Sequence, residues 1–283
     1  MNKITINTKK HIKKEINKEI KKSEGYKAFL KKEKTQKYSV KFWQIFLVVF
    51  FLVGWEVLAR VGIVNTFLLS SPSAIWVLFL EYLKDGSIFT HIGISVWETI
   101  LGFSIGTIIG IIVAILLWWS KTFARICDPF LVVLNALPKT ALAPILIVWA
   151  GAGIKGIVVI AVTISVVTTI LSAYNYFINV EEEKVQMLKS FGATKYQILT
   201  KLILPSNIGN IINIVKINIG LSWVGVIVGE FLVSRYGIGY LIVYGGQVFR
   251  LDLVMMGVMV LAVCAWIMYE IVNLIEKLYK TKR

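Results

Sequence analysis

The sequence predicts an all-α integral membrane protein with about six transmembrane helices. Three observations predict this fold class. Hydrophobic residues make up 57% of the 283 residues and the mean hydropathy is +0.75, whereas a soluble domain is about 45–50% apolar. The apolar residues form runs that approach the length needed to cross a hydrocarbon core of about 30 Å. The Lys and Arg residues gather between and beyond these runs. The uncharged runs are 99–120, 140–154, 156–180 and 253–269.

A basic tail precedes the first apolar run. Residues 1–41 carry 14 Lys and 4 Glu, which is +10 of the net charge of +15. Basic flanking segments stay cytoplasmic, and this explains the charge better than binding to nucleic acid does. Ile12, Ile16 and Ile20 leave two interpretations open, an amphipathic helix that touches anionic lipid headgroups or a solvated tail. We therefore expect a cytoplasmic tail, 1–41, and a transmembrane domain, 42–283, with no signal peptide.

The spans follow one another with short connections. An outer segment at 63–88 should contain a short helix that Ser73 caps and that ends near Gly86, and a Gly-rich outer segment should precede the last span. Six spans return the chain to its starting side, so every basic cluster, and both termini, would lie in the cytoplasm. The expected spans are about 42–62, 90–119, 127–150, 157–178, 206–233 and 252–275.

Small residues mark a close contact between helices. Gly102, Gly106 and Gly110 recur at every fourth position of the second span, and such a stripe lets helices approach closely in lipid. The partner of this stripe could lie within the chain or in a second copy. Cys127 and Cys264 are far apart in or beside apolar runs, so neither a disulfide framework nor a metal site is indicated.

The segment 181–205 is too charged to cross a bilayer, yet it is strongly patterned. It predicts two short helices that are joined at Gly192 and end at Pro205. The acidic residues 181–183 favour the first turn, where the helix dipole is positive. In the first helix, an apolar stripe is formed by Val185, Leu188 and Phe191.

The second helix of this segment starts with a clear signal. Thr194 and Gln197 have the spacing of a capping box. Its apolar face is formed by Tyr196, Leu199, Leu202 and Ile203. Two short helices with a glycine hinge can dock on a soluble partner, and the alternative is an amphipathic hairpin that lies on the membrane.

Charges inside the spans are candidate pathway residues because they are expensive in a bilayer. Glu230 and Trp223 are seven residues apart, hence roughly on one face, and Asn218 and Ser222 lie near them in sequence. We predict that this face lines a solute pathway. The alternative is that Glu230 pairs locally at the membrane interface.

Other charged groups lie within or beside the spans. Lys139 and Lys216 could attract an anionic solute or extend to the headgroups. Glu56 and Arg60 are four residues apart and should form a local ion pair. Glu98 lies in the second span, near its outer end.

Three classes of function can be compared with these features: a membrane subunit that couples to a soluble partner, a membrane enzyme and a secondary transporter. The chain contains no Gly-Lys dipeptide and therefore no phosphate-binding loop, so any ATP hydrolysis must occur on another polypeptide. A membrane enzyme is disfavoured because His11 and His91 offer no catalytic or metal-binding cluster. A secondary transporter would leave the helix pair at 181–205 without a purpose.

The helix pair resembles the EAA loop of permease subunits of ATP-binding-cassette importers. Gly192 and Leu204-Pro205 match that motif, whereas Gln186-Met187-Leu188 departs from its E-A-A triplet. The segments LPKTALAPILIVWAGAG, LLSSPSAIW and GLSWVGVIVGEFLVSRYGIGYLI resemble the nitrate/sulfonate/taurine-type subgroup. These relatives commonly have Arg where this chain has Glu98, which puts an anion-binding role for that position in doubt.

The resemblance implies a type I importer permease with the MetI-like fold and a cytoplasmic coupling helix pair. Its implied partners are a second permease copy (a homodimer), two ATPase subunits that bind ATP and Mg, and an extracytoplasmic substrate-binding protein, in a prokaryotic inner membrane. No cofactor is expected on this chain. The implied coupling residues are Glu182, Val185, Gln186, Leu188, Lys189, Phe191, Gly192, Ala193, Thr194 and Pro205.

The solute is the least determined feature. A sulfonate-, taurine- or nitrate-like anion is favoured by the resemblance. The alternatives are a thiamine-pyrimidine or a riboflavin precursor, because similar permeases carry them.

Overall fold

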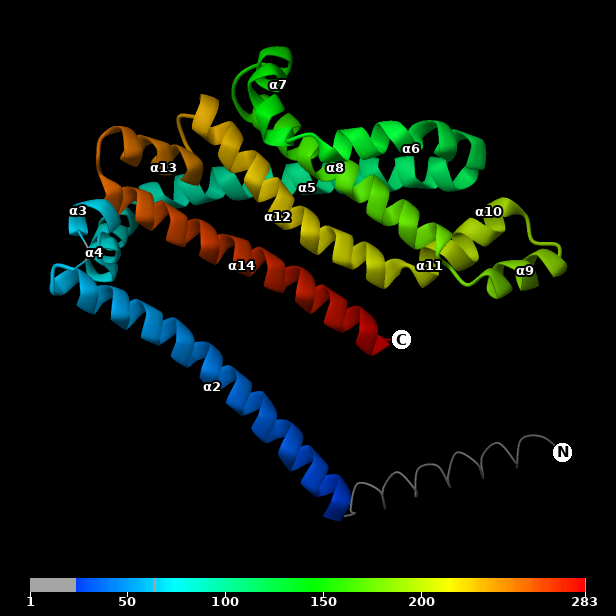
Figure 1. Cartoon of the computed structure of the whole chain (residues 1–283), viewed down its shortest axis with the longest axis horizontal. Helices are drawn as coiled ribbons and strands as arrows, with labels where there is room; N and C mark the ends of the chain where they lie inside the picture. The colour runs from blue at the N-terminus through cyan, green and yellow to red at the C-terminus, as the bar shows by residue number, and fades with distance from the viewer. Residues whose placement is uncertain (1–23, 64, 283) are drawn as a thin grey trace. The chain divides into compact units, whose positions relative to one another are not determined.

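The computed structural model describes residues 24–63 and 65–282 (Figure 1). The described residues are helical with short connections and contain no strand, which confirms the all-α fold class. The chain divides into two units, Met1–Val64 and Asn65–Arg283.

The described part of the first unit, residues 24–63, contains one long helix, α2 (Glu24–Arg60). It runs without a break through position 41, where the sequence placed the end of the basic tail. The predicted amphipathic pattern at Ile12, Ile16 and Ile20 lies outside the described residues. The predicted local ion pair is present, with Arg60 Nε 2.7 Å from Glu56 Oε1.

Aromatic side chains line one stretch of α2. The rings of Phe42 and Phe46 stack with their centroids 6.3 Å apart, and those of Phe46 and Phe50 stack at 5.9 Å. Trp43 meets the ring of Phe46 edge-on at 5.5 Å. These i, i+3 and i, i+4 contacts follow from helical geometry, and they give α2 an exposed aromatic surface.

The second unit contains all the other described elements. They are α3 (Thr66–Leu69), α4 (Pro72–Lys84), α5 (Ser87–Trp119), α6 (Lys121–Ala136), η1 (Lys139–Leu142), α7 (Ala143–Ala150), α8 (Ile154–Ile178), α9 (Glu182–Ser190), α10 (Lys195–Ile198), η2 (Leu199–Ile203), α11 (Leu204–Ser206), α12 (Ile208–Val233), α13 (Ile238–Gln247) and α14 (Leu251–Lys282).

Five described helices are long and apolar enough to cross a membrane: α2, α5, α8, α12 and α14. The bent pair formed by α6 and η1–α7 would make a sixth crossing. The prediction of about six spans is therefore confirmed as five or six. The start of the last helix matches the expectation, but α14 continues to Lys282.

The expected third span, 127–150, is not one continuous helix but is broken within its length. α6 ends at Ala136, a short 3-10 helix follows, and the axis turns by 86° before α7. Pro138 explains the break, because a proline disfavours the helical conformation of the preceding residue. Leu137 is accordingly extended, with φ −65° and ψ 136°.

The helix expected in the outer segment is α4, but Ser71 caps it and Ser73 does not. Ser71 is extended and its Oγ accepts a hydrogen bond from the Ala74 N–H at 3.3 Å. Pro72 is the first helical residue, where its missing N–H does no harm, so Ser73 already lies inside the helix.

The turn from α4 into α5 is fixed by Asp85. Its Oδ1 accepts hydrogen bonds from the N–H (2.9 Å) and the Oγ (2.6 Å) of Ser87. These bonds favour the ionised carboxylate and hold the pKa of Asp85 below its usual value. Gly86, with φ +77°, turns the chain between them.

The glycine stripe packs within the chain and forms the core of the second unit. A Cβ at Gly102 would lie 2.6 Å from the Cβ of Ala161 on α8, and one at Gly110 would lie 2.5 Å from the Cβ of Thr169. Gly225 of α12 meets the backbone of Ala161 in the same way. α5, α8 and α12 therefore approach each other at backbone distance, as small residues allow in membranes.

One helix of the second unit was not predicted. α13 lies in the Gly-rich outer segment and packs against α14, α12 and α5 (Figure 1). No helix was expected in this Gly-rich segment from the sequence. Ile238 and Leu241 are buried, and this burial stabilises a helix that glycine alone disfavours.

We expect Gly102→Leu to lower the free energy of unfolding by about 1–3 kcal/mol, because the added side chain must push α5 away from α8. Unfolding of the purified chain in detergent micelles measures this. Gly93→Leu is the matched control, because a Cβ at Gly93, in the same helix, meets nothing within 4 Å. Equal effects of the two substitutions would contradict the packing described for α5.

Candidate functional site

The segment 181–205 forms the predicted pair of short helices at one end of the bundle (Figure 1). α9 ends in a turn in which Gly192 has φ +76°, a conformation that favours glycine. The capping box is confirmed: the Gln197 N–H donates to Thr194 Oγ1 (3.3 Å), and the Thr194 N–H donates to Gln197 Oε1 (2.8 Å). These contacts fix the start of α10.

Pro205 does not end the second helix where the sequence predicted. The chain widens into the π-helix η2, in which the Leu204 N–H bonds to the Leu199 carbonyl, and it stays helical through Ser206. Pro205 lies in the first turn of α11, a position that proline tolerates. The turn into α12 is made by Asn207, whose Nδ2 donates to the Ile203 carbonyl at 2.9 Å.

The predicted apolar stripe of α9 is divided between two faces. Val185 and Leu188 are half-buried, whereas Phe191 is 80% exposed. Val185 and Leu188 pack on a cluster that joins the ends of α5 and α8 to the α10–η2 segment, which we call the loop-base cluster. Its members are Ala114, Ala173, Phe177, Ile198, Leu199, Ile203 and Ile214.

Only part of the stripe is therefore free to meet another molecule. The successive positions 185, 188 and 191 drift around the helix because three residues are less than one turn. Phe191 lies after the last helical residue and points outward together with Met187 and Tyr196, which are also exposed. Docking was expected on Val185 and Leu188 as well, but these residues hold the loop to its own bundle.

Lys195 links the loop to α5, a contact that the sequence did not reveal. Its Nζ donates to the Trp119 carbonyl at the end of α5. The ammonium also lies 5.8 Å and 5.4 Å from the ring centroids of Trp118 and Trp119, within the range of cation–π attraction. A cation near the carbonyl end of a helix is favourable, so this contact ties α10 to α5.

The remaining predicted coupling residues lie on α9 or in the turn. Glu182 accepts a hydrogen bond from Gln186 Nε2 at 3.2 Å. Lys189 is exposed, and Ala193 is half-buried against the loop-base cluster. Glu182, Gln186 and Lys189 are exposed, and their side chains line the space between α9 and the ends of α5, α6 and α8.

The predicted pathway residues of α12 lie on its buried face. Asn218 is fully buried, and its Nδ2 donates at 2.7 Å to both Thr107 Oγ1 of α5 and Thr169 Oγ1 of α8. Ser222 and Trp223 are buried beside it. These residues sit where the three closely packed helices meet.

Glu230 fixes the start of α13. It is 1% exposed; its Oε1 accepts from Ser95 Oγ at 2.5 Å, and its Oε2 accepts from the Gly239 N–H at 2.5 Å. Ser95 Oγ in turn accepts from the Ile238 N–H at 2.7 Å. A Cβ at Gly237 or at Gly239 would overlap the Glu230 side chain, which explains why both positions are glycine.

Glu98 is buried next to this arrangement. It is 1% exposed, and its carboxyl lies next to that of Glu230. Its side chain is buried within the bundle, and the depth near the outer interface expected from the sequence stays a prediction. Glu98 is buried beside a second carboxyl, that of Glu230, and two neighbouring carboxyls do not form a site that attracts an anion.

Four buried polar atoms, one on α5 and three on α12, have no hydrogen-bond partner within the described protein. They are Glu98 Oε2, Asn218 Oδ1, Ser222 Oγ and Trp223 Nε1. An unpaired buried polar group costs about 1–3 kcal/mol, so such groups call for an explanation.

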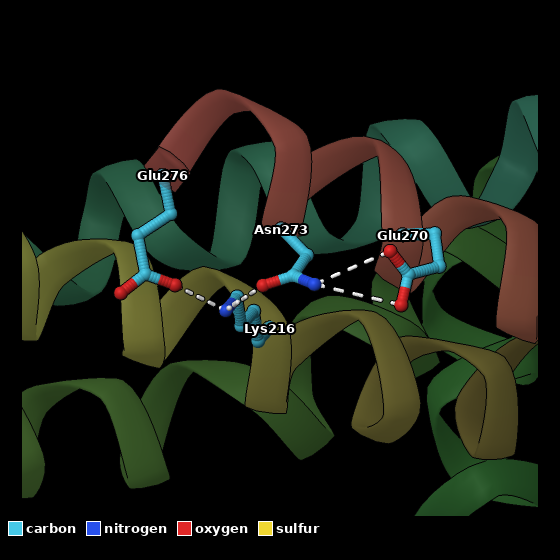
Figure 2. Close-up of polar contacts among 4 residues, drawn as sticks. All are labelled: Lys216, Glu270, Asn273 and Glu276. Carbon is cyan, nitrogen blue, oxygen red and sulfur yellow. Dashed lines mark hydrogen bonds and ion pairs between the residues drawn. The ribbon is translucent and has the colours of Figure 1, made fainter. Parts of the chain in front are cut away.

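The two candidate lysines have different environments. Lys139 lies in the break between α6 and α7, and its Nζ donates to Asn135 Oδ1 at 3.3 Å. Lys216 of α12 reaches α14, where it forms an ion pair with Glu276 and donates to Asn273 Oδ1 at 3.1 Å (Figure 2). Asn273 Nδ2 lies 3.2 Å from Glu270 Oε2. Lys216 thus links α12 to α14, which is neither of the two roles expected from the sequence.

We expect Lys216→Met to lower the free energy of unfolding by about 3–5 kcal/mol, because it leaves a largely buried carboxylate without its cation. The double variant Lys216→Met/Glu276→Leu should recover most of that loss, as apolar replacement of a whole pair often does. Unfolding in detergent micelles provides the measurement.

The control is the exposed pair of α2. Arg60→Met should change stability by less than about 1 kcal/mol, because solvent-exposed ion pairs contribute little. A loss from Lys216→Met as small as that from Arg60→Met would contradict a structural role for the Lys216–Glu276 pair.

A bundle of spanning helices with a folded, charged helix pair at one end defines the class of membrane transport subunits that work with soluble partners. Residues 106–282 match the model of the family of binding-protein-dependent transport system inner membrane components. The match covers more than half of the chain, and the chain belongs to this family. It is the permease of an ATP-binding-cassette importer.

Curated relatives agree with this membership. The aliphatic sulfonates transport permease protein SsuC of Bacillus subtilis is 27% identical over 223 residues, covering 79% of this chain and 81% of the relative. The formylaminopyrimidine transport permease protein ThiX of Halalkalibacterium halodurans is 29% identical over 189 residues, covering 67% and 75%.

A solved structure shares the fold. It shows inward-facing conformations of the MetNI methionine ABC transporter, with a TM-score of 0.63 and 14% identity. The likeness covers 69% of this chain and 96% of that one. This confirms the MetI-like fold that the sequence predicted.

Proposed function

We propose that α9 and the turn that follows it dock on a separate ATPase subunit and transmit its movement to the bundle. One observation carries this proposal: Phe191, Met187 and Tyr196 are exposed on a loop whose opposite face is packed into the chain's own core. Exposed apolar groups gathered on one surface are typical of a docking site.

The loop is built to move together with the bundle. Val185 and Leu188 pack on the loop-base cluster, and Lys195 bonds to the end of α5. A push on α9 therefore reaches α5 and α8 through packed side chains, because close-packed contacts transmit strain. Glu182 and Gln186 are exposed and are proposed to set the register on the ATPase, and Lys189 is exposed beside them.

The assembly follows from this role. We propose two copies of this permease, two ATPase subunits that hold ATP and Mg, and an extracytoplasmic binding protein. Both termini and α9 would face the cytoplasm, in agreement with the positive-inside rule. The membrane would be a prokaryotic inner membrane.

The solute is proposed to be a small sulfonate- or taurine-like anion, because the similarity to SsuC extends over 79% of the chain. A pyrimidine precursor is the second candidate, because ThiX is similar over 67%. Co-purification of an ATPase would distinguish an importer of either solute from a secondary transporter, which has no ATPase partner.

The buried polar face of α12 is proposed to line the pathway in another conformation of the cycle. The unpaired atoms of Asn218, Ser222 and Trp223 support this. They would meet water or solute once α12 parts from α5 and α8, which would offset the cost of their burial here. Lys139 is proposed to lie at the pathway entrance, and Glu230 to hold α13 beside it.

We expect Phe191→Ser to abolish co-purification of the ATPase and leave the folded yield unchanged, because the ring is exposed and supports nothing within the chain. Phe89→Ser is the matched control, since Phe89 is also exposed, at the other end of α5. Pull-down of the ATPase from membranes measures both. Full ATPase binding by Phe191→Ser would overturn the docking surface.

Leu188→Ala should act differently from Phe191→Ser. The ATPase should still bind, but transport per ATP hydrolysed should fall several-fold, because the contact between α9 and the loop-base cluster is weakened. Uptake and ATP hydrolysis in the same proteoliposomes give the ratio. An unchanged ratio would contradict transmission through Leu188.

A further inference from the structure

A cavity of about 720 Å³ lies between the helix pair and the ends of α5, α6 and α8. Its walls include four basic side chains, Lys121, Arg125, Lys189 and Lys195, and one carboxylate, Glu182. The remaining lining is largely apolar and includes the Trp118 ring. The cavity therefore carries an excess of positive charge and belongs to the second unit alone.

None of these four cations forms an ion pair with a described carboxylate, and three of them make no side-chain hydrogen bond to a described residue either. Lys121, Arg125 and Lys189 form no ion pair with another described residue, whereas Lys195 bonds to the Trp119 carbonyl. The Glu182 carboxylate accepts a hydrogen bond from Gln186 Nε2. The cationic groups come from α6 and α9, so an anion between them would bridge these two helices.

The position of the cavity matches the surface of a bilayer. Trp118 and Trp119 close the apolar helix α5, and tryptophan is enriched at membrane interfaces. On α6, an exposed apolar strip begins directly after Arg125. Its members are Ile126, Phe130 and Val133.

We propose that this cavity binds the phosphate of an anionic phospholipid headgroup, with the acyl chains along the apolar strip of α6. Lys121 and Arg125 supply one side of the site and Lys189 the other. Arg and Lys are the side chains that hold phosphate in proteins. The lipid would hold α9 against α6, so the importer would couple ATP hydrolysis to transport only in membranes that contain anionic lipid. This regulation rests on the proposed docking of α9 on the ATPase.

The test uses the full chain in phosphatidylcholine vesicles that contain spin-labelled phosphatidylglycerol. Electron paramagnetic resonance gives the immobilised fraction of the label and its displacement by unlabelled phosphatidylglycerol. Each Lys or Arg near an anionic surface contributes enough that Lys121→Gln and Arg125→Gln should each weaken retention roughly fivefold. Arg125→Lys, which keeps the charge, should recover most of it.

Lys201→Gln is the matched control, because Lys201 is exposed in η2 and does not line the cavity. It should leave lipid retention unchanged. Equal weakening by Lys201→Gln would show a diffuse surface charge, and no weakening by Lys121→Gln and Arg125→Gln would show an empty cavity. Either result overturns the proposal.

Two further measurements identify the source of the phosphate. Inorganic phosphate should fail to displace spin-labelled phosphatidylglycerol; displacement would show a site for free phosphate and contradict the lipid. Binding of the ATPase should leave the label immobilised, whereas its release would show that the partner fills the cavity.

The outcome is separable from that of the proposed function. If the ATPase co-purifies but phosphatidylglycerol is not retained, the lipid site is wrong and α9 docking stands. If phosphatidylglycerol is retained with no ATPase bound under any condition, the lipid site stands and the coupling role fails.

Discussion

The rest of the structure depends on the close approach of α5, α8 and α12 at small residues. Gly102, Gly110 and Gly225 leave no room for a side chain where these helices meet. This contact holds the ends of α5 and α8 together as a base for the helix pair. It also brings the polar face of α12 against α5 and α8. In lipid, no hydrophobic driving force draws the helices together, so such packing is a main source of helix association.

The bundle carries two polar arrangements with different roles. Glu230, Ser95 and the Gly239 N–H are fully hydrogen-bonded and fix α13, and the Lys216–Glu276 pair fixes α14 on α12. The α12 face around Asn218 and Ser222 is only partly satisfied. A satisfied network rigidifies, whereas a partly satisfied one is costly in a low dielectric. We infer that the first two are fixed joints and that the third opens during transport.

Much of this structure could be predicted from the sequence, but its exceptions have physical causes. Length and hydropathy gave the spans, and the capping box at Thr194 gave the start of α10. The expected third span is broken at Pro138, because proline disfavours the helical conformation of the residue before it, even within an apolar run. α13 was missed because burial of Ile238 overrides the low helix propensity of its glycines. The division of the α9 stripe and the Lys195–Trp119 contact depend on tertiary packing, which periodicity does not contain.

The central claim is that the two faces of α9 have separate roles, and site-directed crosslinking tests it most directly. In a variant with Cys127 and Cys264 replaced by Ser, single cysteines at Phe191 and at Leu188 would be treated with a short bifunctional thiol reagent in the presence of the ATPase. The account predicts crosslinks to the ATPase from position 191 and none from position 188. Crosslinks of equal yield from both positions would contradict it.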